Sequence, residues 1–183
     1  MEPKPHPPER HEQPKPDVLF HASADRGIRE FEPRADKIRD PLEGPVVFAT
    51  PDKAYASCFL VPTDDSWVKI GRYTADGVTG PWKVVINGEE RFRQLDQGGT
   101  IYGLPSISFT YHADRNMGET EWTSAEPVVP STAEAFDSGL VAMQAQGVDV
   151  YFVDDKAFQG INESNDHGQS AIASLMPVPV RPD

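Results

Sequence analysis

The stretch Pro45–Phe59 (PVVFATPDKAYASCF) contains a short apolar run followed at once by helix-forming signals. Pro45–Thr50 has the length and the β-branched content of a buried strand. After it, Thr50 can cap free amide groups, Pro51 suits the first helical position, and Asp52 complements the positive end of a helix. A single helical face then carries Ala54, Tyr55, Cys58 and Phe59. We therefore predict a strand that leads directly into a helix.

Further strands are expected on both sides of this unit. Val18–Ser23 (VLFHAS) reads as a short, largely buried strand that enters a loop at Ala24–Gly27. Later apolar or alternating runs predict strands at Trp67–Thr74, Trp82–Ile86, Gly99–Leu104, Ser106–Tyr111, Glu121–Val129 and Val148–Val153. Ala113–Glu119 reads as a loop. The resulting class is α+β, with strands in the majority.

Helices are expected at three later places. Glu89–Leu95 suits a short helix, although Asn87-Gly88 could instead close a hairpin. Ser131 and Glu134 form a capping-box pattern, which predicts a helix that Gly147 ends, with an apolar face made by Phe136, Leu140 and Met143. Asp155–Ile161 is the last predicted helix.

The chain of 183 residues is long enough for one compact domain. The prolines of residues 1–16, with no large apolar residue after Met1, predict a disordered or polyproline-like arm. Residues 17–161 should form the domain. Residues 162–183 are expected to be a flexible tail, although Ala171–Met176 could dock on the domain.

Composition excludes several classes of protein. The sequence has no run long and apolar enough to span a bilayer, and its beginning lacks the apolar core of a signal peptide. Cys58 is the only cysteine, which excludes an intramolecular disulfide and a cysteine-based zinc site. We expect a cytoplasmic protein with no membrane partner.

The formal net charge of −12 works against non-specific binding to nucleic acid, which depends on basic surface. One local basic run contains Arg26, Arg29, Arg34, Lys37 and Arg39. This run reads either as solvated surface or as a local contact for phosphate.

Other common chemistries lack their motifs. No glycine-rich phosphate loop is present. The histidines outside the first strand (His6, His11, His112 and His167) lack the spacing of metal ligands, so no metal is expected. Cys58 on an apolar helix face is better explained as a core residue than as a nucleophile.

Three blocks of the sequence resemble ADP-ribosyltransferase-like proteins of the His-Tyr-Glu type. They are Leu19–Ser23 (LFHAS), Val46–Thr50 (VVFAT) with the helix after it, and Gly118–Val129 (GETEWTSAEPVV). The resemblance extends over about Val18–Pro130, and these blocks are also similar to those of an uncharacterised bacterial family. It implies a split β-sheet core with a few short flanking helices.

The resemblance implies that NAD⁺ is a co-substrate and that Glu121 is catalytic. Cleavage of the nicotinamide–ribose bond develops positive charge on the ribose, and a carboxylate stabilises that charge. Glu119 and Glu126 are alternatives, because a shift of one residue in strand register moves a side chain to the other face.

The same resemblance implies a set of residues that bind NAD⁺. His21 would hold a ribose hydroxyl, the backbone of Ala22 would pair with the nicotinamide amide, and Ser23 would bind the distal ribose. Tyr55 would stack on the nicotinamide ring, with Phe59 as the alternative. Arg34, or otherwise Arg26, would meet the pyrophosphate.

Two departures from the family pattern bear on activity. Ala22 stands where the family has glycine, which permits a closer approach of the backbone to the ligand. The helix has Ser57, Cys58 and Phe59 where the family has a later tyrosine. We expect NAD⁺-dependent transfer of ADP-ribose to an unknown acceptor or to water. The alternative is a non-catalytic module of the same fold that binds a nucleotide or a protein.

Overall fold

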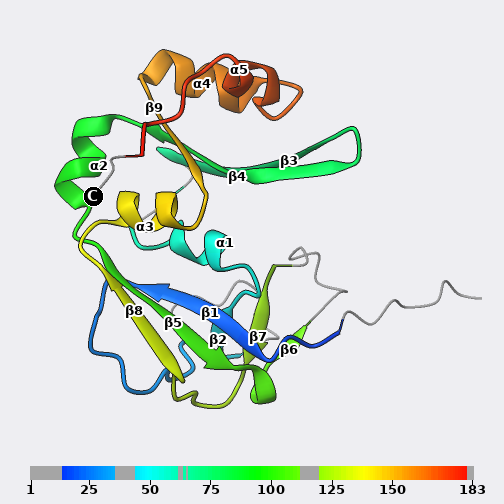
Figure 1. Cartoon of the computed structure of the whole chain (residues 1–183), viewed down its shortest axis with the longest axis vertical. Coiled ribbons are helices and arrows are strands. Elements are labelled where there is room, and N and C mark those ends of the chain that lie inside the picture. The colour runs from blue at the N-terminus through cyan, green and yellow to red at the C-terminus, as the bar shows by residue number, and fades with distance from the viewer. Residues whose placement is uncertain (1–13, 36–43, 62–63, 65, 112–119, 181–183) are drawn as a thin grey trace, which may run out of the picture.

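The computed structural model describes residues 14–35, 44–61, 64, 66–111 and 120–180. These residues form three small β-sheets and several short helices (Figure 1), which confirms the α+β class. Helices α1 (Lys53–Ser57) and α3 (Gly139–Ala145) lie between the third sheet and the other two. The expected loop at Ala113–Glu119 and most of the proline-rich arm lie outside the described residues.

The first sheet has the order β1-β5-β8 and is antiparallel. Its strands are β1 (Val18–Ser23), β5 (Gly99–Pro105) and β8 (Thr132–Phe136). The register places His21 opposite Tyr102 and Ser23 opposite Thr100. The bounds of β1 are those predicted from the sequence.

The second sheet has the order β2-β7-β6. Its strands are β2 (Val47–Ala49), β7 (Trp122–Ser124) and β6 (Thr110–Tyr111). Phe20 of β1 and Thr50 exchange two backbone hydrogen bonds of 2.7 and 2.9 Å, which join the two sheets at one point. The strands therefore follow the order β8-β5-β1-β2-β7-β6 across both sheets.

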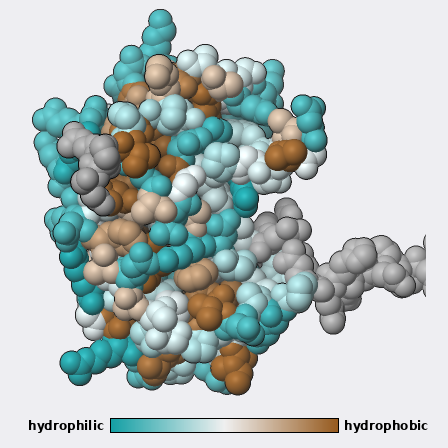
Figure 2. Space-filling model, viewed as in Figure 1, coloured by the Kyte–Doolittle hydropathy of each residue, from teal (hydrophilic) through white to brown (hydrophobic). Residues whose placement is uncertain are grey.

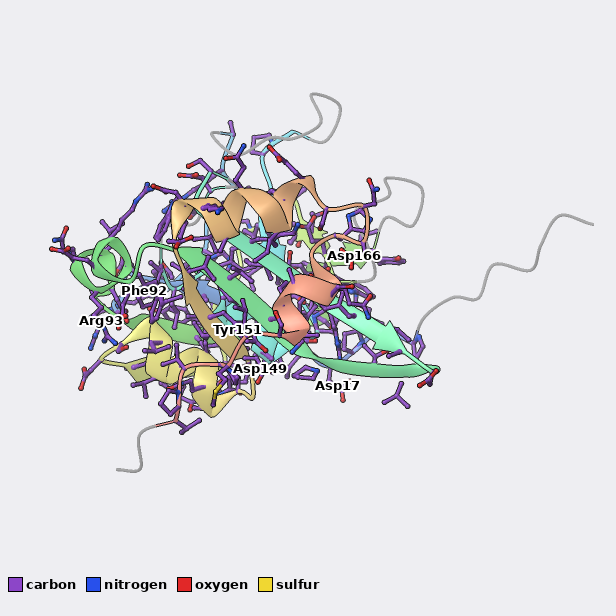
Figure 3. The ribbon with its side chains drawn as sticks, turned by 90° about the horizontal axis from the view of Figure 1, so that it is seen from above. Asp17, Phe92, Arg93, Asp149, Tyr151 and Asp166 are labelled. Carbon is purple, nitrogen blue, oxygen red and sulfur yellow. The ribbon has the colours of Figure 1, made fainter. Side chains whose placement is uncertain are left out.

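The third sheet has the order β3-β4-β9 and is covered on both faces. It consists of β3 (Val68–Ala75), β4 (Val78–Asn87) and β9 (Asp149–Val153), the last parallel to β4. One face packs with Cys58, Phe92 and Met143. The opposite face, with buried Tyr151, packs against α4 (Asp155–Glu163) and α5 (Gln169–Ala173). Figure 3 shows Tyr151 and Asp149 on β9, and Asp166 in the connection between these helices.

The local signals for α1 and α2 (Glu89–Leu95) are confirmed with one change. Asp52, and not Thr50, caps α1, because its carboxylate accepts hydrogen bonds from the amides of Ala54 and Tyr55. Thr50 accepts one from the amide of Asp52. The alternative hairpin at Asn87-Gly88 does not form, since the chain enters α2 there.

The helix predicted to begin at Ser131 is wrong in its first part. Thr132–Phe136 forms β8, which pairs with β5, and α3 begins only after Ser138, whose hydroxyl caps it. Asp96 adds hydrogen bonds to the amides of Gly139 and Leu140. The capping-box pattern at Ser131 was overridden by pairing with a strand about 30 residues earlier in the chain.

Two predicted strands are shorter than expected. Ser106–Ser108 is a 3₁₀ turn, η1, before β6, and Glu121–Val129 contributes only β7 and an isolated bridge from Val128 to Phe31. The hydroxyl of Ser124, the last residue of β7, hydrogen-bonds to the hydroxyl of Ser108 and to the backbone of Glu126.

The segment expected to be a flexible tail, of which Ala171–Met176 could dock, packs on the domain through Ile172 and Val178. It completes α4 and forms α5, whose Ile172 is buried against the third sheet. The amide of Val178 then donates to the carbonyl of Val150. The apolar side chains of this segment supply the reason, since they cover the outer face of the sheet. Among the described residues, no helix has the length and apolarity needed to cross a membrane.

Candidate functional site

His21 lies where the pairing between β1 and β2 ends. Its ring nitrogen Nδ1 is 2.7 Å from the carbonyl oxygen of Phe48. Phe20 and Thr50 form a hydrogen-bonded pair, so a continued antiparallel ladder would next join Ala22 to Phe48. The imidazole therefore bonds to the carbonyl oxygen of Phe48, to which the amide of Ala22 would otherwise donate.

The backbone of Ala22 consequently presents an open edge. In β1, the N–H and C=O of Phe20 both point toward β2, and by the alternation of a strand those of Ala22 do the same. Ala22 forms no backbone hydrogen bond across this gap to any described residue of β2. An adjacent donor and acceptor therefore face the gap between the two sheets.

The face of β1 that carries His21 is aromatic. The ring of Phe31 lies 4.7 Å from the imidazole and 5.1 Å from Tyr102, centroid to centroid. Phe31 and Tyr102 are buried in the cluster that also holds Leu19 and Trp122. Phe31 was missed in the sequence analysis, because the polar stretch around it has no strand or helix periodicity.

Tyr55 is on the other side of the sheet from His21. Helix α1 packs over β1 on the face of Phe20, and Lys53 of α1 lies over the Phe20 ring. The Tyr55 ring contacts Trp82 at 4.6 Å and Phe59 at 5.0 Å. The structure therefore groups Tyr55 and Phe59 together but does not bring either to the imidazole of His21.

Asp52 connects this second aromatic group to α1. Its Oδ2 accepts hydrogen bonds from the indole Nε1 of Trp82 at 2.7 Å and from Arg72 at 3.2 Å, while Oδ1 caps the helix. The arrangement fixes the start of α1 to the β3–β4 hairpin. In Figure 2 this hairpin projects from the right side of the molecule.

Glu121 directly precedes β7 and is half-buried. Since Trp122 pairs with Ala49, Glu121 falls opposite Thr50, two strands from β1. Regular alternation puts Glu121 with Thr50 and Phe20, and His21 on the opposite face. Glu126 is exposed in the turn after β7, and Glu119 lies outside the described residues.

The two arginines considered for the pyrophosphate differ in their contacts. Arg26 donates to the carbonyls of Gln97 and Phe136, at 3.0 and 2.9 Å, and pairs with Asp137. Arg34 is exposed, and its backbone pairs with that of Val46. The side chain of Ser23, at the end of β1, accepts a hydrogen bond from the amide of Asp25.

Two other chemistries find no support in this region. Burial is the main cause that raises the pKa of the Cys58 thiol to about 12, with the Asp52 carboxylate adding to it, so the thiol is protonated and unreactive at neutral pH. Within the described parts of the chain, no group of three or more His, Cys, Asp or Glu residues is arranged to hold a metal ion.

Comparisons of the chain with protein-family models, with curated proteins and with solved structures found no match.

Proposed function

We propose that this chain binds NAD⁺ and transfers its ADP-ribose unit to an acceptor or to water, on an ADP-ribosyltransferase-like fold. The observation that carries the proposal is the open backbone edge of Ala22 beside His21. A primary carboxamide such as that of nicotinamide offers one acceptor and two donors in a plane. The edge of Ala22 can therefore pair with it through two hydrogen bonds.

The alanine in place of glycine does not block this pairing. The methyl group of Ala22 packs with Leu60 and Ile101 on the face that α1 covers. It lies perpendicular to the peptide edge, as side chains of a strand do. The side chain of Ala22 therefore does not cover the N–H and C=O groups that face the gap, and a ligand can approach them.

His21 has a suitable hydrogen-bonding state for a ribose hydroxyl. A carbonyl oxygen only accepts, so Nδ1 must carry the proton in the bond to Phe48. In the neutral imidazole Nε2 is then an acceptor, which matches a hydroxyl donor. Ser23, two residues along β1 on the same face, is the proposed contact for the distal ribose.

Glu121 is the proposed catalytic carboxylate. When the bond between ribose C1′ and the nicotinamide nitrogen breaks, nicotinamide leaves with the bonding electrons and C1′ becomes positive. The acceptor oxygen or nitrogen then bonds to C1′ and loses its proton. Glu121 directly precedes β7, the strand next to β2. Two strand spacings put it roughly 10 Å from β1, a separation that a nucleoside can span.

Two further contacts with NAD⁺ are proposed, an aromatic neighbour of the nicotinamide ring and an arginine at the pyrophosphate. The position of Phe31 against His21 favours Phe31 over Tyr55 or Phe59 as the aromatic neighbour of nicotinamide. Arg34 is favoured over Arg26 for the pyrophosphate, because Arg26 is engaged with two backbone carbonyls.

A non-catalytic binding module is the second candidate. It is favoured by the alternation that places Glu121 and His21 on opposite faces of the strands. Such a module would use the Ala22 edge to bind a nucleotide, or would bind a protein, without cleaving a bond.

Nicotinamide release from NAD⁺ distinguishes the two candidates. The assay compares wild type with Glu121→Gln and with Glu126→Gln, an exposed glutamate in the turn after β7, as the matched control. Release by wild type and Glu126→Gln, but not by Glu121→Gln, supports the transferase or hydrolase. Saturable NAD⁺ binding without release by any variant, with proteins and small nucleophiles as acceptors, supports the module. Absence of NAD⁺ binding contradicts the transferase or hydrolase, and also a module that binds NAD⁺.

A further inference from the structure

Residues 24–35, which we call the strap, cross the face of the sheet that carries His21. Tyr102 lies opposite His21, and its hydroxyl donates to the carbonyl of Asp25 at 2.8 Å and accepts from the amide of Ile28 at 3.2 Å. The ring of Phe31 then contacts the imidazole. The strap thus covers the side of β1 on which His21 projects.

The strap is attached by hydrogen bonds as well as by the apolar contacts of Phe31 and Ile28 with the buried cluster. Phe31 and Val128 exchange two backbone hydrogen bonds of 2.8 and 2.9 Å. Arg26 holds the other end through the carbonyls of Gln97 and Phe136 and through the exposed Asp137. Hydrogen bonds from a charged donor are stronger than those from a neutral donor. We therefore expect Arg26 to contribute most to holding the N-terminal end of the strap.

The covered face contains two buried polar atoms that have no partner among the described residues, Thr100 Oγ1 and Trp122 Nε1. Thr100 is 2% exposed and lies opposite Ser23, next to the start of the strap. Trp122 is 5% exposed, lies opposite Ala49, and packs in one cluster with Phe31. Because a buried polar group without a hydrogen-bond partner is costly, a ligand that supplies these hydrogen bonds would gain affinity on this face.

We propose that the strap is a displaceable cover that opens at Arg26 and admits a ligand to this face. The ligand carries a flat ring, which enters between the rings of Phe31 and His21 as the strap lifts, and polar groups, which hydrogen-bond to Thr100 and Trp122. Only the identification of this ligand as the nicotinamide half of NAD⁺ rests on the proposed function.

Hydrogen exchange in Arg26→Gln tests the cover without any ligand. Arg29→Gln is the matched control, because Arg29 is an exposed arginine of the same strap that has no hydrogen bond or ion pair with the described residues. We expect the amides of Ile28 and Phe31 to exchange about tenfold faster in Arg26→Gln, while the amides of β4 stay unchanged. Equal rates in the two variants, or equal acceleration in β4, would overturn the proposal.

Titration with NAD⁺ then tests the ligand. If the closed strap competes with NAD⁺, apparent affinity rises with the open fraction, by up to the same factor of about ten in Arg26→Gln. If hydrogen exchange shows that the strap opens in Arg26→Gln but both variants bind NAD⁺ with equal affinity, the strap does not cover the NAD⁺ site. If neither variant binds NAD⁺, the proposed function fails, while the exchange rates still decide whether the strap opens.

Discussion

The imidazole of His21 and the carbonyl of Phe48, 2.7 Å apart, replace a backbone hydrogen bond between two strands with a hydrogen bond from a side chain. With this replacement, the backbone pairing between β1 and β2 ends immediately after the pair Phe20–Thr50. It exposes a peptide edge at Ala22 and fixes the orientation of the imidazole at the same time. The candidate site depends on this one relationship, and two of the predictions below test it.

Replacement of His21 by alanine should abolish saturable NAD⁺ binding. The ribose contact is lost, and the carbonyl of Phe48 becomes available to the amide of Ala22, which would close the edge. Isothermal titration calorimetry of His21→Ala and of the control His167→Ala, an exposed histidine between α4 and α5, measures this. Retention of wild-type affinity by His21→Ala would exclude His21 from the site.

Ala22→Pro should weaken NAD⁺ binding while the fold persists. Proline removes the N–H that faces the gap and keeps the C=O, and proline is tolerated in a strand where its nitrogen is not part of the ladder. Loss of one hydrogen bond predicts about tenfold weaker binding. Circular dichroism and a urea titration establish that the variant is folded. Unchanged affinity in a folded variant would show that the Ala22 edge does not contact the ligand.

Thr100→Val should stabilise the protein by about 1 kcal/mol. The two side chains have the same shape, and the change removes a buried hydroxyl whose oxygen has no partner among the described residues. Urea unfolding of Thr100→Val against Thr100→Ser, which keeps the hydroxyl, checks this. A destabilised valine variant would mean that the hydroxyl is hydrogen-bonded in the native protein.

Cys58 should make stability fall at alkaline pH. The folded pKa is raised from 9.0 to about 12, first by burial and then by the Asp52 carboxylate. Between these values the unfolded chain loses a proton that the native protein keeps, so the free energy of unfolding decreases by up to about 1.4 kcal/mol per pH unit. Comparison with Cys58→Ala between pH 8 and 11 isolates this effect from other titrating groups. Identical slopes for the two proteins would disprove it.

Asp52→Ala should destabilise the protein by about 2–3 kcal/mol, since it removes a helix cap and leaves the indole N–H of Trp82 without its acceptor. Urea unfolding measures the loss. Asp137→Ala, which removes a fully exposed carboxylate, is the control and should change stability little. A loss below about 0.5 kcal/mol for Asp52→Ala would show that solvent replaces both contacts.

The sequence by itself determined the elements whose signals are local. Apolar runs located β1 and the strand before α1, because these signals act within a few residues. The short helix expected at Glu89–Leu95 is α2. The three blocks that resemble the ADP-ribosyltransferase-like family contain His21 and Glu121, whose roles in binding and catalysis stay predictions.

Only the tertiary structure decided what depends on contacts between distant residues. Pairing with β5 turned Thr132–Phe136 into a strand against its capping-box pattern, and burial of Ile172 ordered a segment expected to be flexible. The strand order placed His21 beside Phe48 and Phe31 and put Tyr55 on the other face. Neighbours across a sheet are set by register and strand order, which the local pattern of a single strand does not contain.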